Sequence, residues 1–193
     1  MPRRALLLLA ALALVAVVGV GLRQSTGGGA SSSPEAPTAA ELEQRLAGAP
    51  APLARLHARP NALLPAGDAE RELAALKGYP VVVNKWASWC GPCRAEFPTF
   101  QEVSAELGKE VAFLGLDADD ARADAKAFLD DYLLSYPSIY DPRLTASDAL
   151  KVASTFFPTT IFYDAAGRQT YIHQGPYLEA RDLRADIERY ARG

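Results

Sequence analysis

A pair of cysteines constrains this chain more than any other feature. Cys90 and Cys93 are the only cysteines in the sequence, and they stand in the motif Trp-Cys-Gly-Pro-Cys at residues 89–93. An apolar run at 81–83 precedes the motif, and residues 94–107 after it are expected to form a helix. Thiols at positions i and i+3 at the start of a helix lie on one face, close enough to form a small disulfide ring. The spacing therefore predicts a redox-active Cys90–Cys93 disulfide.

The position of each cysteine predicts its role. Unpaired backbone N–H groups at the start of a helix stabilise a thiolate, which lowers the thiol pKa and raises reactivity. Cys90 is therefore expected to be the exposed nucleophile, and Cys93, one turn further, to be partly covered and to resolve the mixed disulfide. Gly91 leaves space beside the nucleophile, and Pro92, which lacks an N–H, is tolerated in the first turn of a helix.

Two other uses of such a pair receive less support. A zinc site would need a second cysteine pair or histidines at ligand spacing, but His57 and His173 are far apart in the sequence. An inert structural disulfide would close a ring of only four residues, which constrains the unfolded chain little. We therefore expect no metal site at the cysteines.

The amino end of the chain is expected to be a membrane anchor or a signal segment, residues 1–22. Two arginines at positions 3 and 4 precede an apolar run from residue 5 to residue 22. A helix of this length spans about 27 Å, close to the hydrocarbon thickness of a bilayer. The arginines would hold the start in the cytoplasm and place the rest across the membrane. Residues 23–50, rich in Gly, Ser and Pro up to residue 40, are expected to be a flexible linker to a domain at 51–193, and short helices are expected at 41–46 and 52–58.

The string Val-Val-Val-Asn-Lys-Trp-Ala-Ser-Trp-Cys-Gly-Pro-Cys-Arg-Ala-Glu-Phe-Pro at residues 81–98 resembles the thioredoxin superfamily. Within it, the string is similar to the membrane-anchored thiol–disulfide oxidoreductases related to TlpA and ResA. The resemblance covers about residues 60–191. It implies an α/β, thioredoxin-like fold with a mixed central sheet flanked by helices, an N-terminal extension and a central insertion. In the relatives the extension is an added hairpin, which is expected here around residues 61–79.

The resemblance also implies a substrate groove. Pro158 opens an apolar strand, and in the superfamily a cis-proline at this position faces the cysteine motif. The backbone of the residue before it, here Phe157, pairs with an extended substrate. The groove is therefore expected to consist of five residues, namely Trp89, Gly91, Pro92, Phe157 and Pro158.

A glutamate on the cysteine helix is a further candidate. Glu96 stands three residues after Cys93, on the same face of the helix, where a carboxylate can shuttle protons and raise the thiol pKa. The ResA-like proteins have an active-site glutamate at the matching position. The alternative is a first-turn glutamate that only complements the helix dipole. Asn84 stands where thioredoxins proper have a buried aspartate, and an amide cannot act as an acid or a base.

The remaining pattern predicts the outer elements. Strands are expected at 110–116, 156–162 and 169–174, and helices at 121–134, 144–154 and 177–191. The acidic cluster at 117–120 is expected to cap a helix. The core-facing residues are expected to include Ala127, Phe128, Tyr132, Leu178, Leu183, Ile187 and Tyr190.

The function expected from these features is thiol–disulfide exchange without a cofactor. We expect a reductase of protein disulfides, for example in cytochrome c maturation, held by residues 5–22 in the cell membrane as a single-pass protein with its domain on the extracytoplasmic side. The resemblance implies a transmembrane electron donor of the CcdA or DsbD type. A net charge of −3 gives no basic surface for nucleic acid. Two alternatives stay open, a disulfide-forming oxidant of the same fold and a Sco-like copper-binding module, although the latter wants a different cysteine spacing.

Overall fold

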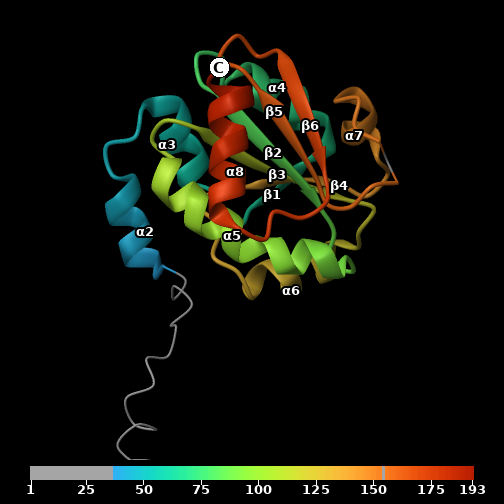
Figure 1. Cartoon of the computed structure of the whole chain (residues 1–193). Coiled ribbons are helices and arrows are strands. Elements are labelled where there is room, and N and C mark those ends of the chain that lie inside the picture. The colour runs from blue at the N-terminus through green and yellow to red at the C-terminus, as the bar shows by residue number, and fades with distance from the viewer. Residues whose placement is uncertain (1–36, 154) are drawn as a thin grey trace, which may run out of the picture. The chain divides into compact units, whose positions relative to one another are not determined.

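A six-stranded mixed sheet forms the centre of the part of the chain that the computed structural model describes, residues 37–153 and 155–193 (Figure 1). Its strands lie in the order β1-β4-β3-β2-β5-β6. They are β1 (Leu63–Pro65), β2 (Val81–Trp86), β3 (Ala112–Ala118), β4 (Ser138–Asp141), β5 (Thr159–Tyr163) and β6 (Gln169–Gln174). The pairs β1–β4, β4–β3 and β3–β2 are parallel, and β2–β5 and β5–β6 are antiparallel. The expected thioredoxin-like mixed sheet is thereby confirmed.

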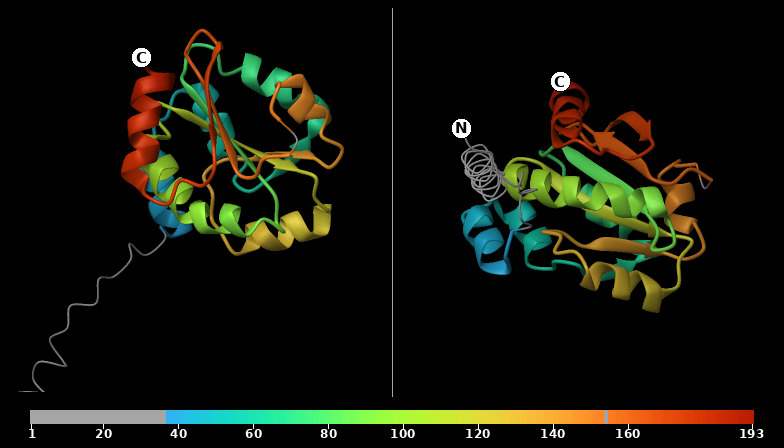
Figure 2. Two further views of the ribbon diagram at one scale, coloured as in Figure 1. Left: turned by 45° about the vertical axis from the view of Figure 1, so that its right-hand side comes forward. Right: turned by 60° about the horizontal axis from the view of Figure 1, so that its bottom comes forward.

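Helices cover both faces of this sheet (Figure 2). They are α2 (Ala39–Leu46), α3 (Ala51–His57), α4 (Ala69–Ala74), α5 (Gly91–Leu107), α6 (Arg122–Asp130), α7 (Thr145–Ala149) and α8 (Ala180–Asp186), with a 3-10 turn, η1 (Ala66–Asp68), and a π-helical turn, η2 (Ile187–Ala191). Alternate residues of a strand point to opposite faces. Val82 and Trp86 accordingly pack with α5, α6 and α8, whereas Val81 and Val83 pack with α3, α4 and α7.

The order of the strands positions the cysteine motif. β2 lies at the centre of the sheet, and all six of its residues are buried. It leads directly into the loop that carries the motif, while its neighbour β5 begins immediately after Pro158. Lys85 near the end of β2 is paired with Thr159 at the start of β5. The motif and the proline therefore reach the same end of the sheet from two adjacent strands.

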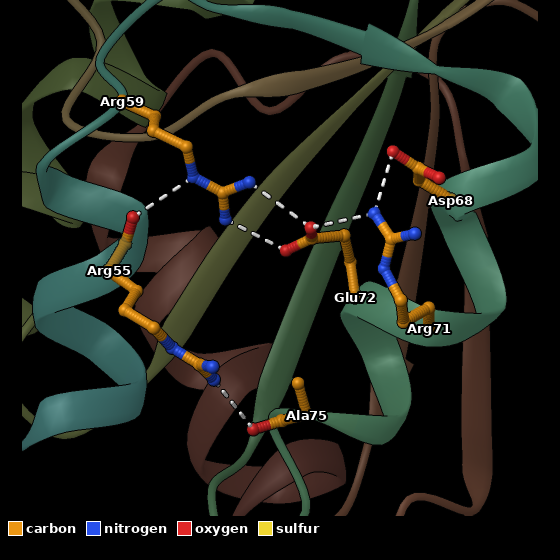
Figure 3. A network of polar contacts seen from close by, with 6 residues as sticks. All are labelled: Arg55, Arg59, Asp68, Arg71, Glu72 and Ala75. Carbon is orange, nitrogen blue, oxygen red and sulfur yellow. Dashed lines mark hydrogen bonds and ion pairs between the residues drawn. The ribbon is translucent and has the colours of Figure 1, made fainter.

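The expected hairpin in the N-terminal extension is wrong. β1 forms no antiparallel pair but lies parallel to β4, with Leu64 opposite Ile139. The chain cannot fold back as a hairpin because the residues after Pro65 enter η1 and then α4. The extension is held by an ion pair between α4 and the end of α3, in which Arg59 donates two hydrogen bonds, of 3.1 and 2.8 Å, to Glu72 (Figure 3).

The domain also begins earlier than residue 51. The range 23–50, expected as a linker, contains α2, which confirms the short helix expected at 41–46, and its Leu42 and Leu46 are buried beside Ala105 of α5. These leucines are four residues apart and form the apolar stripe of an amphipathic helix. Thr38 and Glu41 form a capping box at its start. The expected anchor at residues 1–22 lies outside the described residues. Within residues 37–153 and 155–193, no helix is both long and apolar enough to cross a membrane.

Two outer helices are shorter than expected, since α7 covers only Thr145–Ala149 instead of 144–154 and α6 also ends early. α6 ends at Asp130 instead of 134 because Asn61 donates hydrogen bonds to the carbonyls of Leu129 and Tyr132, at 2.8 and 2.6 Å, and so replaces a further helical turn. Ala127, expected in the core, is exposed. The N-cap residue of α6 is Ala121 and not a residue of the acidic cluster, and it makes no side-chain capping hydrogen bond.

The last helix also begins later than expected, at Ala180 instead of 177. Leu178, expected on its buried face, is 61% exposed, whereas the neighbouring Tyr177 is buried. Tyr177 is held from outside the helix, because its backbone N–H donates to Glu96 and its hydroxyl donates to Asp186. Leu183 and Ile187 are buried as expected. The segment before α8 is therefore fixed by polar contacts that helical periodicity does not reveal.

Candidate active site

A disulfide joins Cys90 and Cys93 at the start of α5. The two Cα atoms are 5.2 Å apart, as the spacing of one helical turn allows. Cys90 is the N-cap residue of α5, and its Sγ accepts a hydrogen bond of 3.1 Å from the backbone N–H of Cys93. The first cysteine thus lies where unpaired helical N–H groups favour a negative charge.

Both cysteines are less accessible than expected. Cys90 was expected to be exposed, but only 4% of its surface is accessible, and Cys93 is fully buried. Both belong to the apolar cluster between the sheet and α5, together with Trp86 and Phe97. Cys90 is still the more accessible of the two cysteines, as expected, because only Cys90 retains a contact with solvent.

The five residues expected to form the groove lie in two segments, residues 89–92 at the start of α5 and residues 157–158 before β5. Gly91 and Pro92 are exposed on the first turn of α5, and a Cβ atom at Gly91 would meet nothing within 4 Å. In the second segment, the bond between Phe157 and Pro158 is cis, as expected. The two segments meet where the ring of Trp89, 58% exposed, lies 4.9 Å from the ring of Phe157.

The loop between β2 and α5 is fixed by acidic residues. Asp120 accepts hydrogen bonds from the backbone N–H and the hydroxyl of Ser88, and the indole N–H of Trp89 donates to the carbonyl of Asp119 at 2.8 Å. The cluster at 117–120, expected to cap a helix, thus holds the loop residues Ser88 and Trp89 that precede Cys90. Asp117 in the same cluster is fully buried. Its pKa is raised to about 8, mainly by burial and also by the negative charge of Asp120.

Glu96 is buried on the cysteine helix, one turn after Cys93. Its Oε1 accepts a hydrogen bond of 2.8 Å from the amide of Asn84, and its Oε2 accepts one of 3.1 Å from the N–H of Tyr177. Burial raises the pKa of Glu96 to about 8, although both hydrogen bonds act in the opposite direction. The carboxyl group is therefore mostly protonated at neutral pH, and near that pH it can both donate and accept a proton.

The pairing of Asn84 with Glu96 was missed by sequence reasoning. Asn84 was expected as a core amide and Glu96 as a residue on the helix, but the two form one buried unit across β2 and α5. The signal was available, since Asn84 alternates with Val82 and Trp86 on the face of β2 that packs against α5, the helix that carries Glu96. The buried Lys85 was missed as well, although a lysine within an otherwise apolar strand is unusual.

Neither histidine is placed as a ligand beside the cysteines. Both ring nitrogens of His57 lie within hydrogen-bonding distance of backbone carbonyls, at 2.9 Å from Ser135 and 2.8 Å from Gly108. The ring of His173 stacks on Tyr177 at 4.2 Å. Among the residues that the structure describes, no group of three or more His, Cys, Asp or Glu side chains could hold a metal ion. No observation of the described chain therefore favours a copper-binding module.

Comparisons with known proteins agree with the fold and the disulfide. The chain is 36% identical over 107 residues to the thiol-disulfide oxidoreductase ResA of Oceanobacillus iheyensis, with 54% of each chain covered. It is 38% identical over 98 residues to a homologue of the thiol:disulfide interchange protein DsbE from Paracoccus denitrificans, covering 50% of this chain and 51% of that one. The matches thus span about half the length of these relatives.

A solved structure and a family model give the same assignment. The crystal structure of a DsbF homologue from Corynebacterium diphtheriae matches with a TM-score of 0.56 and 35% identity, over 61% of this chain and 75% of that one. The model of the AhpC/TSA family matches residues 54–172, more than half of the sequence. With its thioredoxin-like fold and its pair of cysteines, this chain belongs to the AhpC/TSA family.

Proposed function

We propose that this protein is a thiol–disulfide oxidoreductase that reduces disulfides in other proteins. The observation that carries the proposal is the Cys90–Cys93 disulfide at the start of α5, together with the cis Phe157–Pro158 bond before the adjacent strand β5. The names of the relatives support it, because ResA and DsbE are named for thiol–disulfide chemistry. The arrangement supplies a nucleophile, a second thiol and a surface for the substrate chain.

The proposed reaction begins with the reduced protein. The Cys90 thiolate attacks one sulfur of a substrate disulfide, so that a Cys90–substrate bond forms and the first substrate sulfur leaves as a thiolate. The Cys93 thiolate then attacks Sγ of Cys90, restores the disulfide seen in the structure and releases the second substrate sulfur. Two electrons pass to the substrate, and the protein is left oxidised.

Glu96 is proposed to move the proton of Cys93. In the resolving step an ionised Glu96 takes the proton of the Cys93 thiol, and when the disulfide is reopened the protonated carboxyl returns it to the leaving thiolate. A pKa of about 8 suits both directions, because it lies close to that of an ordinary thiol. Trp89, Gly91, Pro92, Phe157 and Pro158 are proposed to contact the substrate chain.

The cycle needs a supply of electrons, and the location proposed for the protein determines their source. The apolar run at residues 5–22 after two arginines supports a membrane segment that places the domain outside the cytoplasm. There we propose that a transmembrane partner of the CcdA or DsbD type re-reduces Cys90–Cys93. Apocytochrome c is one class of substrate that such a reductase would serve.

The reduction potential tests the proposed direction. The purified protein would be equilibrated with thiol–disulfide buffers of known potential, and its dithiol fraction measured. A value near or below about −250 mV supports a reductase that depends on an electron donor. A value near about −120 mV would identify a disulfide-forming oxidant and reverse the direction of electron flow.

A further inference from the structure

Lys85 is a fully buried lysine in the centre of the sheet, five residues before Cys90. Burying an ammonium group is costly unless polar contacts and charges offset the loss of water. Burial indeed lowers the pKa of Lys85 to about 8, against the opposing effect of the carboxylates of Asp141 and Asp119. The contacts of this side chain therefore show what its charge is used for.

Those contacts converge on the segment that leads into the cis-proline. The ammonium donates hydrogen bonds to the backbone carbonyl of Ala153 at 2.7 Å and to that of Phe156 at 3.3 Å. It also lies 3.9 Å from the centre of the Phe157 ring, within the range of a cation–π interaction. The Thr159 hydroxyl donates to the same Phe156 carbonyl at 2.9 Å. One buried cation thus fixes the backbone and the side chain immediately before Pro158.

The contacts continue from Phe157 to the surface. Phe157 also packs against Trp89, whose indole N–H is in turn held by the carbonyl of Asp119. Trp89 and Phe156 are large apolar side chains that remain exposed, at 58% and 51%. Lys85, Phe157 and Trp89 therefore form a continuous chain of contacts from the buried strand to the exposed apolar side chain next to Cys90.

We infer that Lys85 is a positioning residue, which holds Phe157 and Pro158 in the conformation that receives the chain of a substrate protein. The inference rests on the proposed function and adds to it a distinction between protein disulfides and small disulfides as substrates. A protein disulfide must be laid along the groove before its sulfur reaches Cys90. A small disulfide needs only the narrow opening at Cys90, because it has no chain to be held. Lys85 therefore matters for the first class of substrate and not for the second.

The test compares Lys85→Met with the unchanged protein on two disulfides. The pre-reduced proteins are mixed with insulin or with hydroxyethyl disulfide, and the second-order rate of disulfide formation is followed by tryptophan fluorescence. We expect the rate with insulin to fall about tenfold, which is the effect of one charge-assisted hydrogen bond. The rate with hydroxyethyl disulfide should stay within about twofold, and the reduction potential should not change.

Two further variants make the result interpretable. Lys85→Gln keeps a shorter N–H donor without the charge, and we expect an intermediate loss with insulin; it also carries the test if Lys85→Met does not fold. Lys77→Met is the matched control, since Lys77 is an exposed lysine just before β2 whose side chain lies near Gly167, and it should behave as the unchanged protein.

Each outcome decides between the two levels of the proposal. Equal losses on both disulfides, or a shifted potential, would mean that Lys85 acts on the cysteines themselves and would overturn the inference. Unchanged rates on both would overturn it too. If the unchanged protein oxidised its thiols with neither disulfide, the proposed function itself would fail, and that result is independent of position 85.

Discussion

Replacement of Glu96 by Gln should abolish a large part of the pH dependence of stability. The carboxyl is buried with a pKa of about 8, whereas the same group in the unfolded chain has a pKa near 4.5. The folded protein therefore binds a proton that the unfolded chain has lost, so that stability falls as the pH rises. Between about pH 5 and about pH 7 this one group should remove about 2–3 kcal/mol of the free energy of unfolding.

Urea unfolding of the oxidised protein and of Glu96→Gln, at several pH values in this range, measures the effect. Gln can accept the hydrogen bond from Asn84 but not the second one from Tyr177, so we expect a loss of about 1 kcal/mol that is independent of pH. The difference between the two proteins should therefore shrink as the pH rises and then change sign, because unfolding of the unchanged protein releases the proton of Glu96 and so becomes more favourable at higher pH.

Asp117→Asn is the matched control. Asp117 is also buried with a pKa raised to about 8, mainly by burial, and its removal should flatten the pH profile to a similar degree without touching the Asn84–Glu96 pair. Parallel profiles for the unchanged protein and Glu96→Gln would refute the reasoning, since they would mean that Glu96 is ionised in the folded state at pH 5 to pH 7.

The cysteine variants test the order of attack: Cys90→Ser should abolish disulfide exchange, whereas Cys93→Ser should accumulate mixed disulfides with substrate proteins, detected by non-reducing electrophoresis. Trapping by Cys90→Ser instead would exchange the two roles. Gly115→Ala should lower the free energy of unfolding by about 1–3 kcal/mol, because the new Cβ would collide with Ser138 and come within 3.0 Å of Trp86. Gly67→Ala, where nothing lies within 4 Å, is its control and should stay within about 0.5 kcal/mol in the same urea titration.

The centre of the molecule could be predicted because local and long-range signals agree there. The apolar run of β2, the cysteine spacing and the proline before β5 each indicate one element, and the resemblance arranges them in space. The outer parts depend on contacts between distant residues, which no local pattern contains. Asn61 ends α6 from about seventy residues away, and β1 finds its partner in β4 instead of in a neighbouring strand.

The candidate site shows the same division. Spacing and resemblance are enough to identify four candidate residues, namely Cys90, Cys93, Glu96 and Pro158. The burial of Cys90 does not, because it depends on the cluster that closes over the start of α5. Lys85 was overlooked because a charged residue in a strand reads as a solvent-facing position. Its alternation in β2 points it instead to the segment before Pro158, which lies about seventy residues further along the chain.

The parallel pairing of β1 with β4 bears on how this edge of the sheet is protected from other chains. Without residues 61–65, the hydrogen bonds from Ser138 to the carbonyl of Ala62 and from Asn61 to that of Tyr136 would be lost, and β4 would become an open border of the sheet. Such an edge strand has unpaired backbone N–H and C=O groups, which can pair with strands of other molecules. β1 closes it with only three residues, the last a proline that cannot donate a further backbone hydrogen bond. A version of the protein shortened to begin at β2 should therefore self-associate, even though its cysteines and its groove would be complete.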